Sequence, residues 1–124
     1  MRQDAKDRIR EQMERYHSGD PAKKAEAVEE IVKEHRKFVK HVINQHYKIY
    51  KRAWYDDMFS VGIIGILEAL PTYDPDKGTP TTHFFQYINH EIFEFIAEFA
   101  NKTTTQYLFT QTATEPFLKI TLLY

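Results

Sequence analysis

The sequence predicts an all-α protein: one compact domain of four helices followed by an irregular C-terminal tail. Most of its four glycines and five prolines lie around residues 19–21 and 71–80, so the segments between them are long and uninterrupted. Within those segments apolar residues recur every three or four positions, which is the spacing of one helix face. We expect the helical domain to cover residues 1–107 and the tail to cover residues 108–124.

The first two helices are marked by their apolar stripes. The first is expected over about residues 2–16, with a stripe made of Ala5, Ile9, Met13 and Tyr16. The second begins where Asp20, a favoured N-cap residue, precedes Pro21, which suits the first helical turn. It should end near Tyr47. Its stripe consists of Ile31, Val32, Phe38, Val39, Val42 and Ile43, continued by His35 and His46.

The third helix is expected from Asp56 to Leu70, after an irregular stretch that begins at His46. It reads "DDMFSVGIIGILEAL" and is apolar on nearly every side, so it should be buried on most sides or meet a partner. Gly62 and Gly65 lie in its middle, where each costs roughly 1 kcal/mol relative to alanine. Close approach of a neighbouring helix is the plain reason for such glycines.

The fourth helix should follow the loop at residues 71–80, starting at Thr81 or Thr82 and ending near Phe99. Its apolar side is made of Phe84, Phe85, Ile88, Ile92, Phe95, Ile96 and Phe99. Its polar side is made of His83, Tyr87, His90, Glu91, Glu94 and Glu98, so Tyr87 is expected to project away from the core. After Asn101 the helical period is lost, and residues 117–124 could form a strand, a helical turn or a disordered end.

Composition narrows the class of protein. The chain is 42% hydrophobic and 15% aromatic, so it can bury a core, and it has no cysteine, which excludes disulfides and thiolate zinc sites. A charged N-terminus argues against a signal peptide, and no apolar run is long enough to span a membrane, so we expect a cytoplasmic protein. Residues 1–53 carry a net charge of +5 and residues 54–124 a net charge of −6, which could give one basic and one acidic face.

The motifs of common enzymes and metal sites are missing. There is no P-loop, no Gly-x-Ser-x-Gly and no His-Glu-x-x-His, because the "HEIFE" segment ends in Glu94. His83 and His90 are seven residues apart and could share a helix face, but a pair alone is a weak metal signal. We therefore expect a protein that is not an enzyme and that uses no cofactor, metal or small-molecule substrate.

One stretch resembles a known family. The pattern consists of Asp57-Met58, then Gly62-Ile63-Ile64-Gly65-Ile66, Ala69, the loop Tyr73-Asp74-Pro75-Asp76-Lys77-Gly78, and the helix start Thr81-Thr82-His83-Phe84-Phe85. In order and spacing it is similar to region two of the sigma-70 family of bacterial RNA polymerase sigma factors. The preceding "EEIVKEHRKFVKHVINQHY" is similar to that family's first conserved helix, so the resemblance covers about residues 25–105.

The resemblance implies a role in transcription initiation. The helix that matches residues 57–70 would bind a coiled coil of the beta-prime subunit of core RNA polymerase, and the fourth helix would recognise and melt the promoter minus-ten element. Aromatic rings near its start would stack on bases of the non-template strand. An anti-sigma factor is a further implied partner. The polymerase-binding candidates are Asp57, Ser60, Val61, Ile63 and Leu67.

The DNA-binding candidates lie on the fourth helix and just before the third. They are Phe84, Phe85, Tyr87, Asn89 and His90, with the basic set Lys48, Lys51 and Arg52. Helical phase favours core packing for Phe84 and Phe85 and a DNA-facing position for Tyr87. The basic set is either an ordinary solvated turn or a replacement for positive charge that the fourth helix lacks, since Glu94 and Glu98 stand where many family members carry basic residues.

Two further departures keep a second interpretation open. The family's frequent tryptophan pair is replaced by Gln86, Tyr87 and Ile88, and nothing after Tyr107 resembles the helix-turn-helix domain that reads the minus-thirty-five element. We expect that domain to lie outside this sequence, or to be lost or divergent. The alternative function is a helical protein-interaction module, derived from a sigma factor, that binds polymerase or a regulator without reading promoters.

Overall fold

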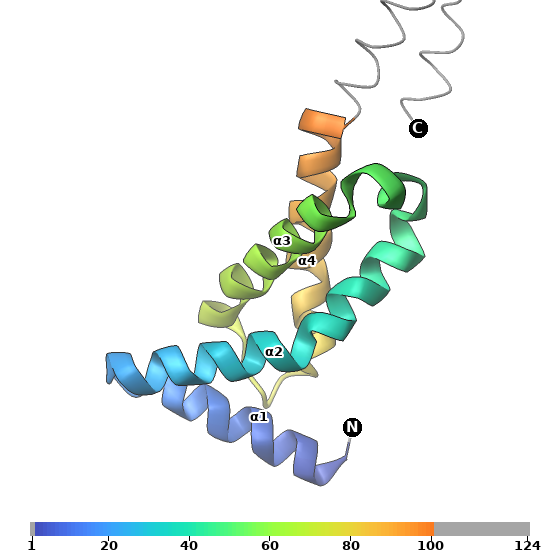
Figure 1. Cartoon of the computed structure of the whole chain (residues 1–124). Helices are drawn as coiled ribbons and strands as arrows, with labels where there is room; N and C mark the ends of the chain where they lie inside the picture. Colours follow the sequence, from blue (N-terminus) through green and yellow to red (C-terminus); the bar gives the residue numbers. More distant parts are fainter. Residues whose placement is uncertain (1, 101–124) are drawn as a thin grey trace, which may run out of the picture.

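The computed structural model describes residues 2–100, and in that range it contains only helices and the turns between them. The four main helices are α1 (Gln3–Tyr16), α2 (Pro21–His46), α3 (Lys51–Ala69) and α4 (Pro80–Phe95). Short helical turns, η1 (Lys48–Tyr50), η2 (Leu70–Thr72) and the π-helical η3 (Ile96–Ala100), extend three of their ends. The predicted all-α, four-helix architecture is confirmed (Figure 1). The predicted tail at residues 108–124 lies outside the described residues.

The helices pack in a chain of neighbours. α1 lies along α2, α2 packs against α3, and α3 and α4 share the most extensive contact, with α4 also reaching α2 (Figure 1). The core lies where α2, α3 and α4 meet. Its fully buried side chains include Ile31, Val39 and Ile43 from α2, Met58 and Ile66 from α3, and Phe84, Ile88 and Ile92 from α4.

The turn between α1 and α2 follows the sequence signals closely. Gly19 has a φ of +86°, a conformation that favours glycine. The Asp20 carboxylate then accepts a hydrogen bond of 2.9 Å from the backbone N–H of Ala22, and Pro21 opens the helix. The predicted start of the second helix is therefore confirmed.

The third helix begins earlier than predicted. It starts at Lys51, directly after η1, and not at Asp56. The residues that hid the helical period are packing residues: Trp54 and Tyr55 are half-buried against the core, and the Trp54 ring meets Phe95 edge-on at 5.7 Å. In this short segment lysines are mixed with aromatics, so the sequence shows no clear apolar stripe. The buried side of the segment is recognised only from its contact with α4.

The two glycines of α3 allow neighbouring helices to approach closely, as predicted: Gly65 faces α4, and the tightest contact of Gly62 is with α2. A Cβ atom at Gly65 would lie 2.8 Å from the backbone of Ile88 and from the carbonyl oxygen of Tyr87, so only glycine fits there. A Cβ atom at Gly62 would lie 2.6 Å from Cγ1 of Val39 on α2. The backbones of α3 and α4 are therefore in direct contact at one point of the crossing.

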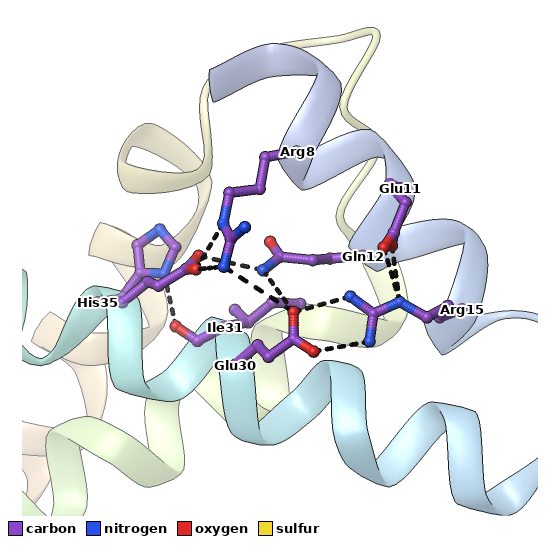
Figure 2. A network of polar contacts seen from close by, with 8 residues as sticks. Arg8, Glu11, Gln12, Arg15, Glu30, Ile31 and His35 are labelled. Atoms are coloured by element: carbon purple, nitrogen blue, oxygen red, sulfur yellow. Dashed lines mark hydrogen bonds and ion pairs between the residues drawn. The ribbon is translucent and has the colours of Figure 1, made fainter. Parts of the chain in front are cut away.

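α1 is held on α2 by apolar packing and by a polar network. Ile9 and Met13 are buried, and beside them Arg15 forms two parallel hydrogen bonds with Glu30, of 2.7 and 2.8 Å (Figure 2). Arg8 pairs with Glu34, and the buried Gln12 amide donates to Glu30 and Glu34 (3.3 and 3.1 Å). These contacts fix both the rotation and the position of α1 along α2.

The loop between α3 and α4 is anchored at both ends. Tyr73 is buried, and its hydroxyl donates to the carbonyl oxygen of Gly78 at 2.9 Å. The Thr79 hydroxyl then caps α4, which begins at Pro80, one residue before the predicted range. Arg10 of α1 reaches Asp76 in this loop at 2.6 Å. The start of α4 is thus positioned from both α3 and α1.

None of the helices between residues 2 and 100 is long and apolar enough to cross a membrane.

Candidate functional surfaces

The side of α3 that faces away from the core forms the first candidate surface. Ser60, Ile63, Ile64 and Leu67 are spaced at i, i+3, i+4 and i+7, so they share one helix face, which we call the outer α3 face. Ile64 and Leu67 remain 47% and 42% exposed. Large apolar side chains exposed together on a central helix are typical of a protein-binding surface.

The predicted polymerase-binding residues are divided by the structure. Asp57, Ser60 and Leu67 are exposed, whereas Val61 and Ile63 are half-buried against the core. Ile64 was not among the predicted residues, although it is more exposed than Leu67. The helix is apolar on all sides, so its sequence alone does not reveal which of its apolar residues face outward.

A groove beside this face was also not predicted. It has a volume of about 450 Å³ and is lined by Glu29, Val32, Lys33, Arg36, Ile63 and Leu67. Its α2 wall is mostly charged, and its α3 wall is apolar. Val32 belongs to the predicted apolar stripe of α2. Its place in that stripe was the only feature of the sequence that indicated a contribution of α2 to this surface.

On α4 the first two predicted aromatics serve the core. Phe84 has no exposed surface and packs against the rings of His35 and Tyr73, at 5.1 and 5.5 Å. Phe85 is half-buried, with its ring 5.4 Å from that of His46. The sequence-based preference for core packing is confirmed for Phe84 and holds in part for Phe85.

Tyr87 does not project away from the body, and in this respect the prediction was wrong. It is half-buried against the core, its ring lies 5.3 Å from His83, and its hydroxyl is 3.1 Å from Oγ1 of Thr72. The helical phase placed Tyr87 on the polar side correctly. Near its edge, however, the polar side of α4 contacts η2. A residue on that side therefore need not be exposed to solvent.

Asn89 and His90 lie further round the helix. The Tyr47 hydroxyl donates to Oδ1 of Asn89 at 2.6 Å, so the end of α2 is tied to the middle of α4. His90 is exposed, with Nε2 3.8 Å from a carboxylate oxygen of Glu94. Gln86, Asn89, His90 and Phe93 share one helix face, which we call the outer α4 face. Phe93 is 59% exposed and was not predicted as a site residue.

The basic set lies next to this region. Lys48, Lys51 and Arg52 are exposed and, with Tyr55, line a shallow depression of about 490 Å³. Lys48 follows Tyr47 directly, so the hydrogen bond between Tyr47 and Asn89 brings the start of this basic segment beside α4. The structure therefore brings the start of the basic set beside Asn89 of α4.

A small pocket opens where α4 begins. It has a volume of about 220 Å³, and its lining includes Thr72, Lys77, Thr82, His83 and Gln86. Its wall also contains Tyr73, whose pKa burial raises to about 12. The residues that line the pocket offer hydroxyl, imidazole, amide and ammonium groups.

The seam between α3 and α4 carries negative charge. Glu91 shares a hydrogen bond with Glu68, and this bond, burial and the charge of Glu68 raise the pKa of Glu91. Because like charges repel each other, the Glu68 carboxylate disfavours ionisation of Glu91. α4 thus lacks the cationic surface that would attract phosphates by itself.

Comparison with known proteins gives the class. The model of the sigma-70 region 2 family matches residues 31–98, more than half of the 124 residues. The chain belongs to this family, and the resemblance found in the sequence is confirmed. No curated protein and no solved structure gives a significant match. Membership implies a sigma-factor role in transcription initiation, which is not enzymatic. The matched segment contains α3 and α4 entirely and leaves out α1.

Proposed function

We propose that the chain binds core RNA polymerase through the outer α3 face and the adjoining groove, and promoter DNA through the outer α4 face. The polymerase contact would be to the coiled coil of the beta-prime subunit. The observation that carries this proposal is the exposure of Ile64 and Leu67 on a helix whose opposite side is the centre of the core. An anti-sigma factor would compete for the same apolar surface. A chain with this function would act in the cytoplasm, together with polymerase.

The DNA part of the proposal concerns the non-template strand of the minus-ten element. Unstacking a base costs a few kcal/mol, and stacking on an aromatic ring returns roughly 1–3 kcal/mol per base. A protein surface that binds only the opened strand therefore shifts the balance toward melting. Thymine–adenine steps unstack most easily, so an adenine–thymine-rich sequence is the expected target. Lys48, Lys51 and Arg52 would follow the phosphates that α4 itself cannot attract.

Polymerase binding is tested by co-elution with core enzyme. Ile64→Asp places a charge in the apolar contact and should abolish co-elution. Ile49→Asp is the matched control, because Ile49 is 75% exposed and lies outside the outer α3 face. Equal co-elution of both variants would refute the proposed polymerase surface.

Promoter binding is tested on the assembled complex with a single-stranded minus-ten oligonucleotide and fluorescence anisotropy. Lys51→Ala combined with Arg52→Ala should weaken binding and reduce the salt slope by roughly 0.7 for each phosphate that is no longer neutralised. Lys23→Ala, at the exposed start of α2, is the control. The alternative function, an interaction module that does not read promoters, is favoured by the acidic pair Glu68 and Glu91. It predicts co-elution with polymerase and no DNA binding by the complex.

A further inference from the structure

We propose that Phe93 is the ring on which a base of the opened strand stacks at the outer α4 face. This inference rests on the proposed function and changes the residue that performs the stacking. The resemblance places the stacking rings near the start of the helix. In this chain those rings have other partners, and the free ring lies further along.

The rings near the start of α4 are occupied. Phe84 is fully buried, and the Phe85 ring rests against His46. Tyr87 is held between His83 and Thr72. For any of them to receive a base on its face, it would have to leave a packed position. Phe93 needs no such change, because 59% of its surface is already exposed, the highest exposure of any Phe or Tyr on α4.

The neighbours of Phe93 suit a nucleic-acid strand better than an apolar protein partner. Gln86, Asn89 and His90 precede it on the same face, seven, four and three residues earlier. With a rise of 1.5 Å per residue, Gln86 and Phe93 are about 10 Å apart along the helix axis. Oδ1 of Asn89 already accepts the Tyr47 hydroxyl, so its amide nitrogen is left to donate to a base edge. A strand along this face would meet three polar groups and then a flat ring.

The positive charge near the outer α4 face also favours a nucleic-acid strand as its partner. The bond between Tyr47 and Asn89 places the chain that continues into Lys48, Lys51 and Arg52 beside this face. Phosphates can therefore be attracted from η1 and the start of α3 while the bases face α4. Stacking is a contact of neutral groups and does not depend on positive charge, so it can still operate on a helix that carries Glu91 and Glu94.

The test uses the chain in complex with core polymerase and a single-stranded minus-ten oligonucleotide with 2-aminopurine placed at each position in turn. Stacking quenches this fluorophore. With the original chain we expect quenching at one position. Phe93→Ala should remove that quenching and weaken binding roughly 5- to 150-fold, the factor that corresponds to one stacked base. Phe93→Tyr keeps a ring and should retain both. Phe99→Ala, where the side chain is 51% exposed, is the matched control and should change neither.

The outcomes separate this inference from the proposed function. If the original complex does not bind the oligonucleotide, the proposed function itself fails. If it binds and Phe93→Ala binds and quenches equally well, the proposed function stands and the role of Phe93 is refuted. If Phe93→Ala loses co-elution with polymerase instead, Phe93 is a protein contact and the inference is refuted. A loss of DNA affinity with an unchanged salt slope supports it, because removing a cation from a phosphate would reduce that slope.

Discussion

Two phenylalanines of α4, nine residues apart, have opposite environments. Phe84 has no exposed surface, whereas Phe93 is mostly exposed. Phe84 lies in the middle of a stripe of buried residues spaced four apart, Pro80, Phe84, Ile88 and Ile92, and its hydrophobic surface is used in folding. Phe93 lies on the far side of the same helix, where its ring contributes nothing comparable to the core. Residue type alone therefore does not separate buried from exposed aromatics on α4, but helical position does.

The ion pair between Arg15 and Glu30 should make stability depend on pH. The two hydrogen bonds from Arg15 lower the pKa of Glu30 from 4.5 to about 2. Between these values the unfolded chain binds more protons than the folded one, so the pair stabilises the fold fully above pH 4.5 and loses its effect as the pH falls toward 2. Glu30→Gln should reduce the loss of stability over this range. Urea unfolding at several pH values measures it, with Glu29→Gln as the control; equal pH profiles for Glu30→Gln and the original chain would contradict it.

At the scale of elements, the crossing of α3 and α4 depends on Gly65. Gly65→Ala would place a methyl group 2.8 Å from the backbone of Ile88, which cannot turn away as a side chain could. We expect a net destabilisation of about 1–3 kcal/mol, typical of overpacking, even though alanine favours helix by roughly 1 kcal/mol. Chemical denaturation measures it.

Gly78→Ala is the matched control for this substitution. A Cβ atom there would meet nothing within 4 Å, and Gly78 does not have a positive φ. Its stability should therefore stay within about 0.5 kcal/mol of the original. If both substitutions changed the stability equally, the close approach of α3 and α4 would not be the reason for a glycine at position 65.

Periodicity and capping signals were sufficient for three of the four helices. α1, α2 and α4 begin and end within about a turn of their predicted limits, because Asp20, Pro21 and the loop at residues 71–80 act through local geometry. The start of α3 was missed because Trp54 is placed by its contact with Phe95, a residue far along the chain. For the same reason the position of Tyr87 against Thr72 could not be predicted: helical phase shows which side a residue faces, not which neighbour lies there.

For the whole molecule, α1 should matter for stability although it lies outside the family segment. It buries Ile9 and Met13 against α2, and burial of such side chains contributes roughly 1.5–3 kcal/mol each. A chain that begins at Ser18 should therefore be less stable than the full chain by several kcal/mol, as measured by urea unfolding. The triple variant Arg8→Gln, Arg10→Gln and Arg15→Gln keeps the apolar contacts and should lose much less. A larger loss from the triple variant would show that ion pairs, not packing, hold α1.

The direct contact of the α3 and α4 backbones has a mechanical consequence. Elsewhere in the core, helices are separated by side chains that can change rotamer and absorb a small displacement. At Gly65 there is no such cushion, because the next atoms are the main chain of Ile88 and Tyr87. A displacement of the outer α3 face would therefore be passed to the outer α4 face with little loss. If polymerase binds the outer α3 face as proposed, that binding would also shift the outer α4 face relative to the DNA strand.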